Sequence, residues 1–178
     1  DPNFVSNVKK LCEYIKPMFK EYNDIFTGNV ILHNRFVGVG KLSHESAISY
    51  GCTGGTGRAC GWHNDLRKHH AYDMYGSVDF DEIVLNNGDC FDRYMVRMKE
   101  MEQSVRILEQ LIDNIPAGDF YIKQKPIIRV PEGQWYTAVE GSRGEIGVYL
   151  DSRGDKSPYR LKFRPMGLPL VSALDEML

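Results

Sequence analysis

Residues 135–150 read WYTAVEGSRGEIGVYL, and this stretch decides the fold class. Apolar and polar side chains alternate through 135–140 and again through 145–150, which is the two-residue period of a strand with two different faces. The alternation returns at 159–164, after a polar segment at 151–158 that predicts a hairpin loop. The C-terminal third therefore predicts a small antiparallel β-sheet.

Upstream of this sheet the apolar residues follow the helical period instead. They recur at spacings of three and four over 3–26, where Pro17 is expected to kink the helix, and over 91–115. The second of these helices is long, and it starts at a turn and capping signal, 86–89. Its other face carries polar residues spaced for solvent or a partner surface: Arg97, Glu100, Gln103 and Arg106.

Further segments complete the secondary-structure prediction. Short apolar runs at 30–32 and 36–37 are of strand type, Ser43 can cap a brief helix, and 168–178 can form a final helix. The stretch 65–87 mixes charges and aromatic rings without a clear period, so we expect it to be irregular.

Length and composition fit one α+β domain over 1–178, mainly helical in 1–116 and β-rich in 117–178. Hydrophobic residues make up 42% and charged residues 26% of the chain, which argues against disorder. With 22 Lys and Arg against 24 Asp and Glu, the chain has no bulk attraction to nucleic acid or to an anionic membrane. No apolar segment reaches membrane-spanning length. We expect both ends of the chain to be cuts in a longer protein.

A polar cluster follows a glycine-rich segment. Residues 51–61 read GCTGGTGRACG, which is too rich in glycine for a stable helix or strand and predicts a loop whose backbone approaches something closely. Arg58, His63, Asp65 and Arg67 are the candidate functional residues there. Imidazoles carry protons near neutral pH, and Asp65 can relay a proton if burial raises its pKa. In the alternative, which composition alone favours, Asp65 pairs with Arg67 or Arg58 and simply holds the loop.

Nucleotide and metal sites are not supported. A phosphate-binding loop needs Ser or Thr directly after Gly-Lys, and Leu42 stands there. The glycines at 54–57 lack the strand, turn and helix that a dinucleotide fingerprint requires. The four cysteines form no CxxC pair, and the adjacent His69 and His70 cannot both reach one ion from regular backbone.

Two acidic segments have ordinary structural interpretations. Asp79-Phe-Asp81-Glu82 is typical of a solvated acidic turn. The segment from Glu140 to Glu145, with Arg143 between paired glycines, is at least as typical of a bulged hairpin turn with local ion pairs as of a site.

The sequence as a whole resembles the quinone-site (D-type) subunit of a proton-pumping NADH:quinone oxidoreductase (respiratory complex I), a relative of hydrogenase large subunits. The motifs that carry the resemblance run in family order across nearly the whole chain: Gly38-Val-Gly40, Ala47-Ile-Ser-Tyr-Gly51, Thr53-Gly54, Arg58-Ala-Cys-Gly61, Asp65-Leu-Arg67-Lys68, Tyr72-Asp73-Met-Tyr75, Phe80-Asp81, Asn87-Gly-Asp-Cys-Phe-Asp-Arg-Tyr94, Arg97-Met-Lys-Glu-Met101, Ser104-Val-Arg-Ile107, Arg143-Gly-Glu145 with Gly147, and Pro158-Tyr-Arg160.

The resemblance implies a peripheral subunit on the cytoplasmic or matrix side of the membrane. Its substrate would be a quinone, ubiquinone or menaquinone, which enters through a membrane-arm subunit and takes electrons from the terminal iron-sulfur cluster of a neighbouring subunit. The chain itself would bind no metal or nucleotide. It would be part of a translocating NADH:quinone oxidoreductase and inactive when isolated.

By the same resemblance, Asp65 looks like the carboxylate that links a quinone-site histidine to the proton-translocating machinery, with Arg58 and Arg67 stabilising its anion. Trp62-His63-Asn64 departs from the mostly apolar triplet of the family, which leaves open whether His63 joins the relay. Two other interpretations stay open. One is a noncatalytic scaffold domain whose polar loop only seats a partner, and the other is a fragment of a membrane-bound nickel-iron hydrogenase large subunit.

Overall fold

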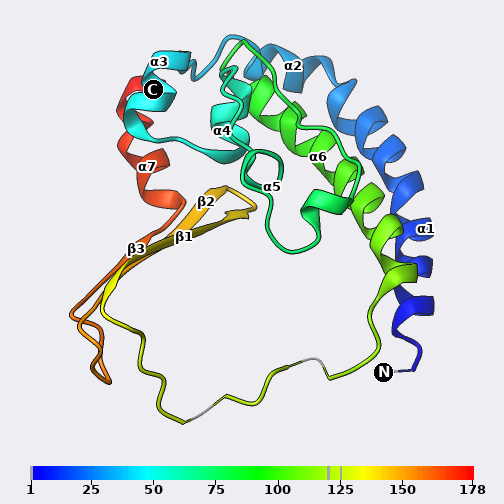
Figure 1. Ribbon diagram of the computed structural model, residues 1–178. Coiled ribbons are helices and arrows are strands. Elements are labelled where there is room, and N and C mark those ends of the chain that lie inside the picture. Colours follow the sequence, from blue (N-terminus) through cyan, green and yellow to red (C-terminus); the bar gives the residue numbers. More distant parts are fainter. Residues whose placement is uncertain (1, 120, 125) are drawn as a thin grey trace.

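The computed structural model describes residues 2–119, 121–124 and 126–178, and it confirms a mixed α+β fold. Two long helices, α1 (Phe4–Tyr22) and α6 (Cys90–Leu111), lie side by side, and a three-stranded sheet stands on the opposite side of the molecule (Figure 1). Cys12 and Phe19 of α1 pack against Val105 of α6 to form one buried apolar cluster. Among the described residues, no helix is long and apolar enough to cross a membrane.

Both long helices form where the apolar period predicts them. α1 contains Pro17 and continues into a π-helical turn, η1 (Asn23–Thr27). α6 begins after Asp89, whose carboxylate accepts the Asp92 backbone N–H at 2.8 Å and so caps the first turn. It ends in a short 3-10 turn, η3 (Ile112–Asn114).

The sheet also confirms the alternation pattern. Its strands β1 (Gly133–Gly141), β2 (Gly144–Ser152) and β3 (Arg160–Arg164) pair antiparallel in the order β1-β2-β3. Glu140 faces Glu145 and Gly141 faces Gly144, so the β1–β2 turn is as short as a hairpin allows.

The remaining elements are short and connect the helices to the sheet. The helix α3 (His44–Tyr50) has the Ser43 cap that the sequence predicts, with the hydroxyl accepting the Ser46 N–H at 3.0 Å. Two short helices replace the single predicted C-terminal helix. These elements are α2 (Val30–Phe36), α3 (His44–Tyr50), α4 (Gly54–Ala59), α5 (Leu66–His69), η2 (Tyr75–Ser77), α7 (Gly167–Ser172) and α8 (Leu174–Met177).

The prediction of strands at 30–32 and 36–37 was wrong, because α2 occupies this segment. The Asn29 side chain accepts the N–H groups of Ile31 at 2.9 Å and Leu32 at 3.3 Å and thereby starts the helix. A short apolar run does not distinguish a strand from a helix, so the capping side chain decides.

The glycine-rich segment was also predicted wrongly in part: residues 54–59 form the helix α4 rather than a loop. The expected close approach is confirmed. A Cβ on Gly54 would lie 2.4 Å from the Gly144 Cα, and one on Gly57 would lie 2.4 Å from the Cys52 carbonyl oxygen. Glycine disfavours an isolated helix, so tertiary packing stabilises this one. α4 contacts both α6 and β2, and α5 contacts β1.

Candidate functional site

Arg58 is the centre of a buried ion cluster. Its side chain leaves α4 and is only 2% exposed. Nη1 donates to Glu140 Oε1 on β1 at 2.8 Å, and Nη2 lies 2.5 Å from Glu100 Oε1 on α6. One guanidinium therefore joins three elements that are far apart in the sequence.

Asp65 caps α5 and is itself 1% exposed. Its Oδ1 accepts the Arg67 backbone N–H at 3.0 Å and Arg67 Nε at 2.9 Å, while Oδ2 accepts Arg67 Nη2 at 2.6 Å. This geometry is a bidentate ion pair between a carboxylate and a guanidinium, and the hydrogen bond from the Arg67 backbone N–H reinforces it. Asp65 is therefore held by its near neighbour in sequence.

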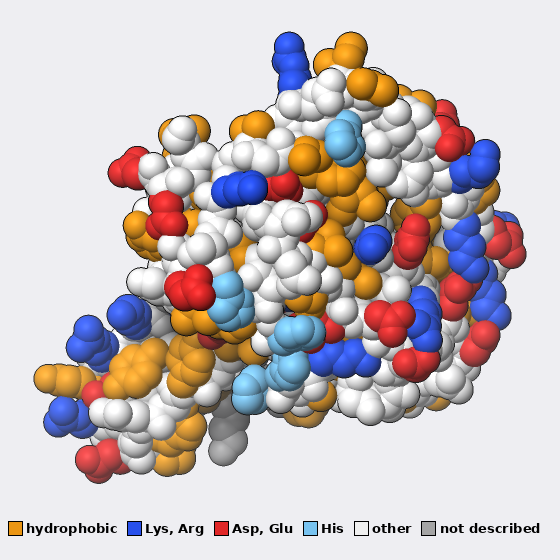
Figure 2. All heavy atoms as spheres, turned by 90° about the horizontal axis from the view of Figure 1, so that it is seen from above, with side chains coloured by type: hydrophobic (Ala, Val, Ile, Leu, Met, Phe, Trp, Pro, Cys, Tyr) orange, Lys and Arg blue, Asp and Glu red, His pale blue; other side chains and the backbone are white. Residues whose placement is uncertain are grey.

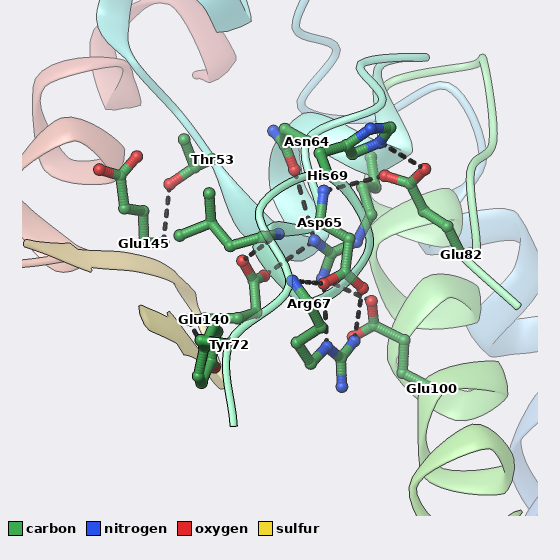
Figure 3. Close-up of polar contacts among 12 residues, drawn as sticks. Thr53, Asn64, Asp65, Arg67, His69, Tyr72, Glu82, Glu100, Glu140 and Glu145 are labelled. Carbon is green, nitrogen blue, oxygen red and sulfur yellow. Dashed lines mark hydrogen bonds and ion pairs between the residues drawn. The ribbon is translucent and has the colours of Figure 1, made fainter. Parts of the chain in front are cut away.

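Glu82 connects this buried pair to the surface. Its Oε1 accepts the Asp65 backbone N–H at 2.9 Å. Its Oε2 lies 3.1 Å from His63 Nδ1 and 3.0 Å from His69 Nε2. The His63 side chain is 66% exposed, so it reaches Asp65 only through Glu82. Figure 3 shows Glu82, Glu100 and Glu140 arranged around Asp65 and Arg67.

The carboxylates of this cluster differ in their affinity for protons. Burial acts to raise the pKa of Asp65, but the hydrogen bonds and charge of Arg67 outweigh it, so the pKa is lowered. At Glu140 burial dominates, and the opposing charge and hydrogen bond of Arg58 do not cancel it, so the pKa is raised. The condition for a relay at Asp65, a raised pKa, is thus met at Glu140 and not at Asp65.

Three buried polar atoms in the cluster have no hydrogen-bond partner among the described residues: Arg58 Nε, Asn64 Nδ2 and Glu100 Oε1. Glu100 Oε1 is close enough to Arg58 for an ion pair but is not aligned for a hydrogen bond. Buried atoms of this kind are commonly bridged by ordered water.

A hollow of about 310 Å³ opens beside the cluster. Histidine side chains gather on the face of the molecule shown in Figure 2. Within the described ranges, no three His, Cys, Asp or Glu side chains are placed to hold a metal ion. The hollow is lined by Thr53, Trp62, His63, Asn64, Leu66, His69, His70, Glu145 and Arg164.

The four candidate residues lie in one region but do not all contact one another. Asp65 pairs with Arg67, as the structural alternative expected, whereas Arg58 pairs with Glu100 and Glu140. Sequence reasoning missed these two glutamates.

Glu100 was assigned to a face for solvent or a partner, and it instead contacts Arg58 of the same chain. Glu140 was assigned to local hairpin pairs, and its partner Arg58 is 82 positions away. Glu82 was assigned to a solvated turn, yet it bonds the Asp65 backbone. The two-residue period of β1, which puts Glu140 on the same face as the half-buried Ala138, was the one signal available in the sequence.

The chain matches a known protein family along its length. The family model described as the 49-kDa subunit of respiratory-chain NADH dehydrogenase matches residues 1–129 and 124–178. A C/D-type NADH-quinone oxidoreductase subunit of Phocaeicola vulgatus is 65% identical over 99% of this chain and 34% of its own length. The D-type NADH-quinone oxidoreductase subunit of Desulfotalea psychrophila is 41% identical over 99% of this chain and 48% of its own. The chain therefore spans about a third to a half of these relatives.

Among solved structures, the membrane-bound sulfane sulfur reductase, an archaeal respiratory membrane complex, contains a similar chain. The TM-score is 0.91 at 32% identity, and the match covers 99% of this chain and 49% of that chain.

Proposed function

The chain belongs to the 49-kDa subunit family of respiratory-chain NADH dehydrogenase, and on this premise we propose that it forms part of the quinone-reducing chamber of a proton-translocating NADH:quinone oxidoreductase. Both relatives quoted above carry the name NADH-quinone oxidoreductase, which supports a quinone as the substrate of the assembled complex. The oxidoreductase activity belongs to the complex, and the isolated 178 residues should oxidise no NADH.

The observation that carries the proposal beyond family membership is the buried ion cluster. Reducing a quinone consumes protons, so the charge in its chamber changes during turnover. A buried cluster senses such a change because low-dielectric surroundings strengthen its charge interactions. In this proposal Asp65 and Arg67 are the fixed charges, Arg58 transmits the change to α6 and β1, and His63 exchanges protons at the surface through Glu82.

Neighbouring subunits supply what the cluster lacks. We propose that the terminal iron-sulfur cluster lies in an adjacent peripheral-arm subunit, and that the quinone enters through a subunit of the membrane arm. The chain would sit on the cytoplasmic or matrix face and hold neither a metal nor a nucleotide. Ion pairs that connect α4 to α6 and β1 would keep this part of the chamber wall in one arrangement.

Replacing Asp65 by asparagine in the intact complex tests the proposal. The change keeps the size of the side chain but removes the charge that holds Arg67, so we expect quinone reductase activity to fall well below wild type while the complex still assembles. Asp81→Asn is the matched control, because Asp81 is an exposed carboxylate that pairs with Arg106 at 3.1 Å. Normal turnover in Asp65→Asn would remove the cluster from the mechanism and leave the scaffold interpretation.

A further inference from the structure

We infer that Glu140 is the carboxyl of the buried cluster that binds a proton, while Asp65 stays ionised. The inference deepens the proposed function by naming the group whose charge changes. The proton itself is a property of the folded chain and does not depend on quinone chemistry.

Charge balance is the first argument. Arg67 is engaged by Asp65, so the single guanidinium of Arg58 is shared between Glu100 and Glu140 in a region from which water is largely excluded. An unpaired charge is costly in such surroundings, and a carboxyl group avoids the cost by taking a proton. Protonating one of these two carboxylates leaves Arg58 with a single anionic partner.

Burial separates Glu140 from Glu100. The Glu140 side chain is 3% exposed and that of Glu100 is 18% exposed. Water reaches the charge of Glu100 more easily, and Glu100 also lies near the positive charge of Arg97. The anionic form of Glu140 is therefore less stabilised by water than that of Glu100.

The hydrogen bonds separate Glu140 from Asp65. Asp65 accepts three bonds from Arg67, all of 3.0 Å or less. Glu140 accepts one short bond from Arg58 at 2.8 Å, and its Oε2 has only a long contact of 3.4 Å with the Leu66 N–H. The proton, taken from water, binds Oε2, because protonating this oxygen gives up only the long contact with the Leu66 N–H.

Groups on every neighbouring element act on Glu140. Burial is the largest influence and raises the pKa of Glu140, Arg58 of α4 opposes it, and the negative charge of Asp65 beside α5 adds to the rise. Tyr72 accepts the Glu140 backbone N–H at 3.1 Å through its hydroxyl oxygen and brings no charge. Across the hairpin, Glu145 faces Glu140 in register as a further carboxylate. Besides Arg58, the charge of Arg67 and the Leu66 N–H favour the anion, but together they do not outweigh burial.

Infrared spectroscopy of the intact complex tests the proton directly. We expect wild type to develop, as the pH falls below neutral, the carbonyl band of a buried protonated carboxylic acid, absent in Glu140→Gln and kept in the hairpin control Glu145→Gln. A wild-type spectrum that Glu140→Gln leaves unchanged would overturn the assignment.

The pH profile of quinone reduction supplies the second readout. Glutamine cannot take up or release this proton, so Glu140→Gln should lower quinone reduction well below wild type and lose the pH dependence that Glu140 confers. Glu140→Ala should lose activity at every pH. A Glu140→Gln complex with both the wild-type infrared spectrum and the wild-type pH profile would overturn the inference. If the infrared band is present but no variant of the cluster changes turnover, the proposed function is wrong and the assignment of the proton to Glu140 still holds.

Discussion

Replacing Arg58 by methionine removes a buried guanidinium and keeps most of the side-chain volume. In the structure this leaves Glu140, 3% exposed, and Glu100, 18% exposed, without the cation that both of them contact. Breaking a buried ion pair by removing one partner costs about 3–5 kcal/mol of unfolding free energy. The cost should lie near the lower end at about pH 5 and near the upper end at about pH 8, because Glu140 relieves it by holding a proton in acid.

Urea unfolding followed by circular dichroism measures this cost. Arg106→Met is the matched control, since Arg106 is 42% exposed and pairs with two exposed carboxylates. It should cost roughly 0–1 kcal/mol. Adding Glu140→Gln to Arg58→Met should recover roughly 1–3 kcal/mol, because the stranded carboxylate is gone. If Arg58→Met costs no more than Arg106→Met, or the double variant recovers nothing, the cluster does not hold these elements together.

Two further predictions concern the backbone contact and the fixed anion. Gly54→Ala should cost about 2–4 kcal/mol of unfolding free energy in the same assay, because its φ of +70° disfavours alanine and the new Cβ meets the Gly144 backbone. Gly167→Ala is the control, since nothing is found within 4 Å of its Cβ, and it should leave stability nearly unchanged. The pKa of Asp65 is lowered from 3.8, so its contribution to stability is present above that value and is lost as the pH falls through the lowered pKa. Asp65→Asn should therefore be less stable than wild type at neutral pH and lack that acid slope, and an unchanged slope would show that Arg67 does not stabilise the anion.

Local patterns explain which parts of the fold could be predicted. The strands of the sheet and both long helices follow periods that a few neighbouring residues define. α2 and α4 do not, because a single asparagine cap starts one and close packing of glycines against β2 stabilises the other.

In the candidate site, too, contacts between near neighbours in the sequence could be predicted and long-range contacts could not. The pair of Asp65 and Arg67 spans two positions, so the sequence could suggest it. The pair of Arg58 and Glu140 spans 82 positions and exists only because α4 and β1 meet in space. Which carboxylate of the cluster accepts fewer hydrogen bonds also depends on long-range contacts, so the sequence could not indicate it.

The shared oxygen of Glu82 fixes the chemical form of two surface imidazoles. An ionised carboxylate only accepts hydrogen bonds, so His63 must carry hydrogen on Nδ1 and His69 on Nε2 to contact it. When both rings are neutral they are opposite tautomers, with the basic nitrogen of His63 at Nε2 and that of His69 at Nδ1. Each ring then keeps one lone pair available for an incoming proton without giving up its bond to the protein.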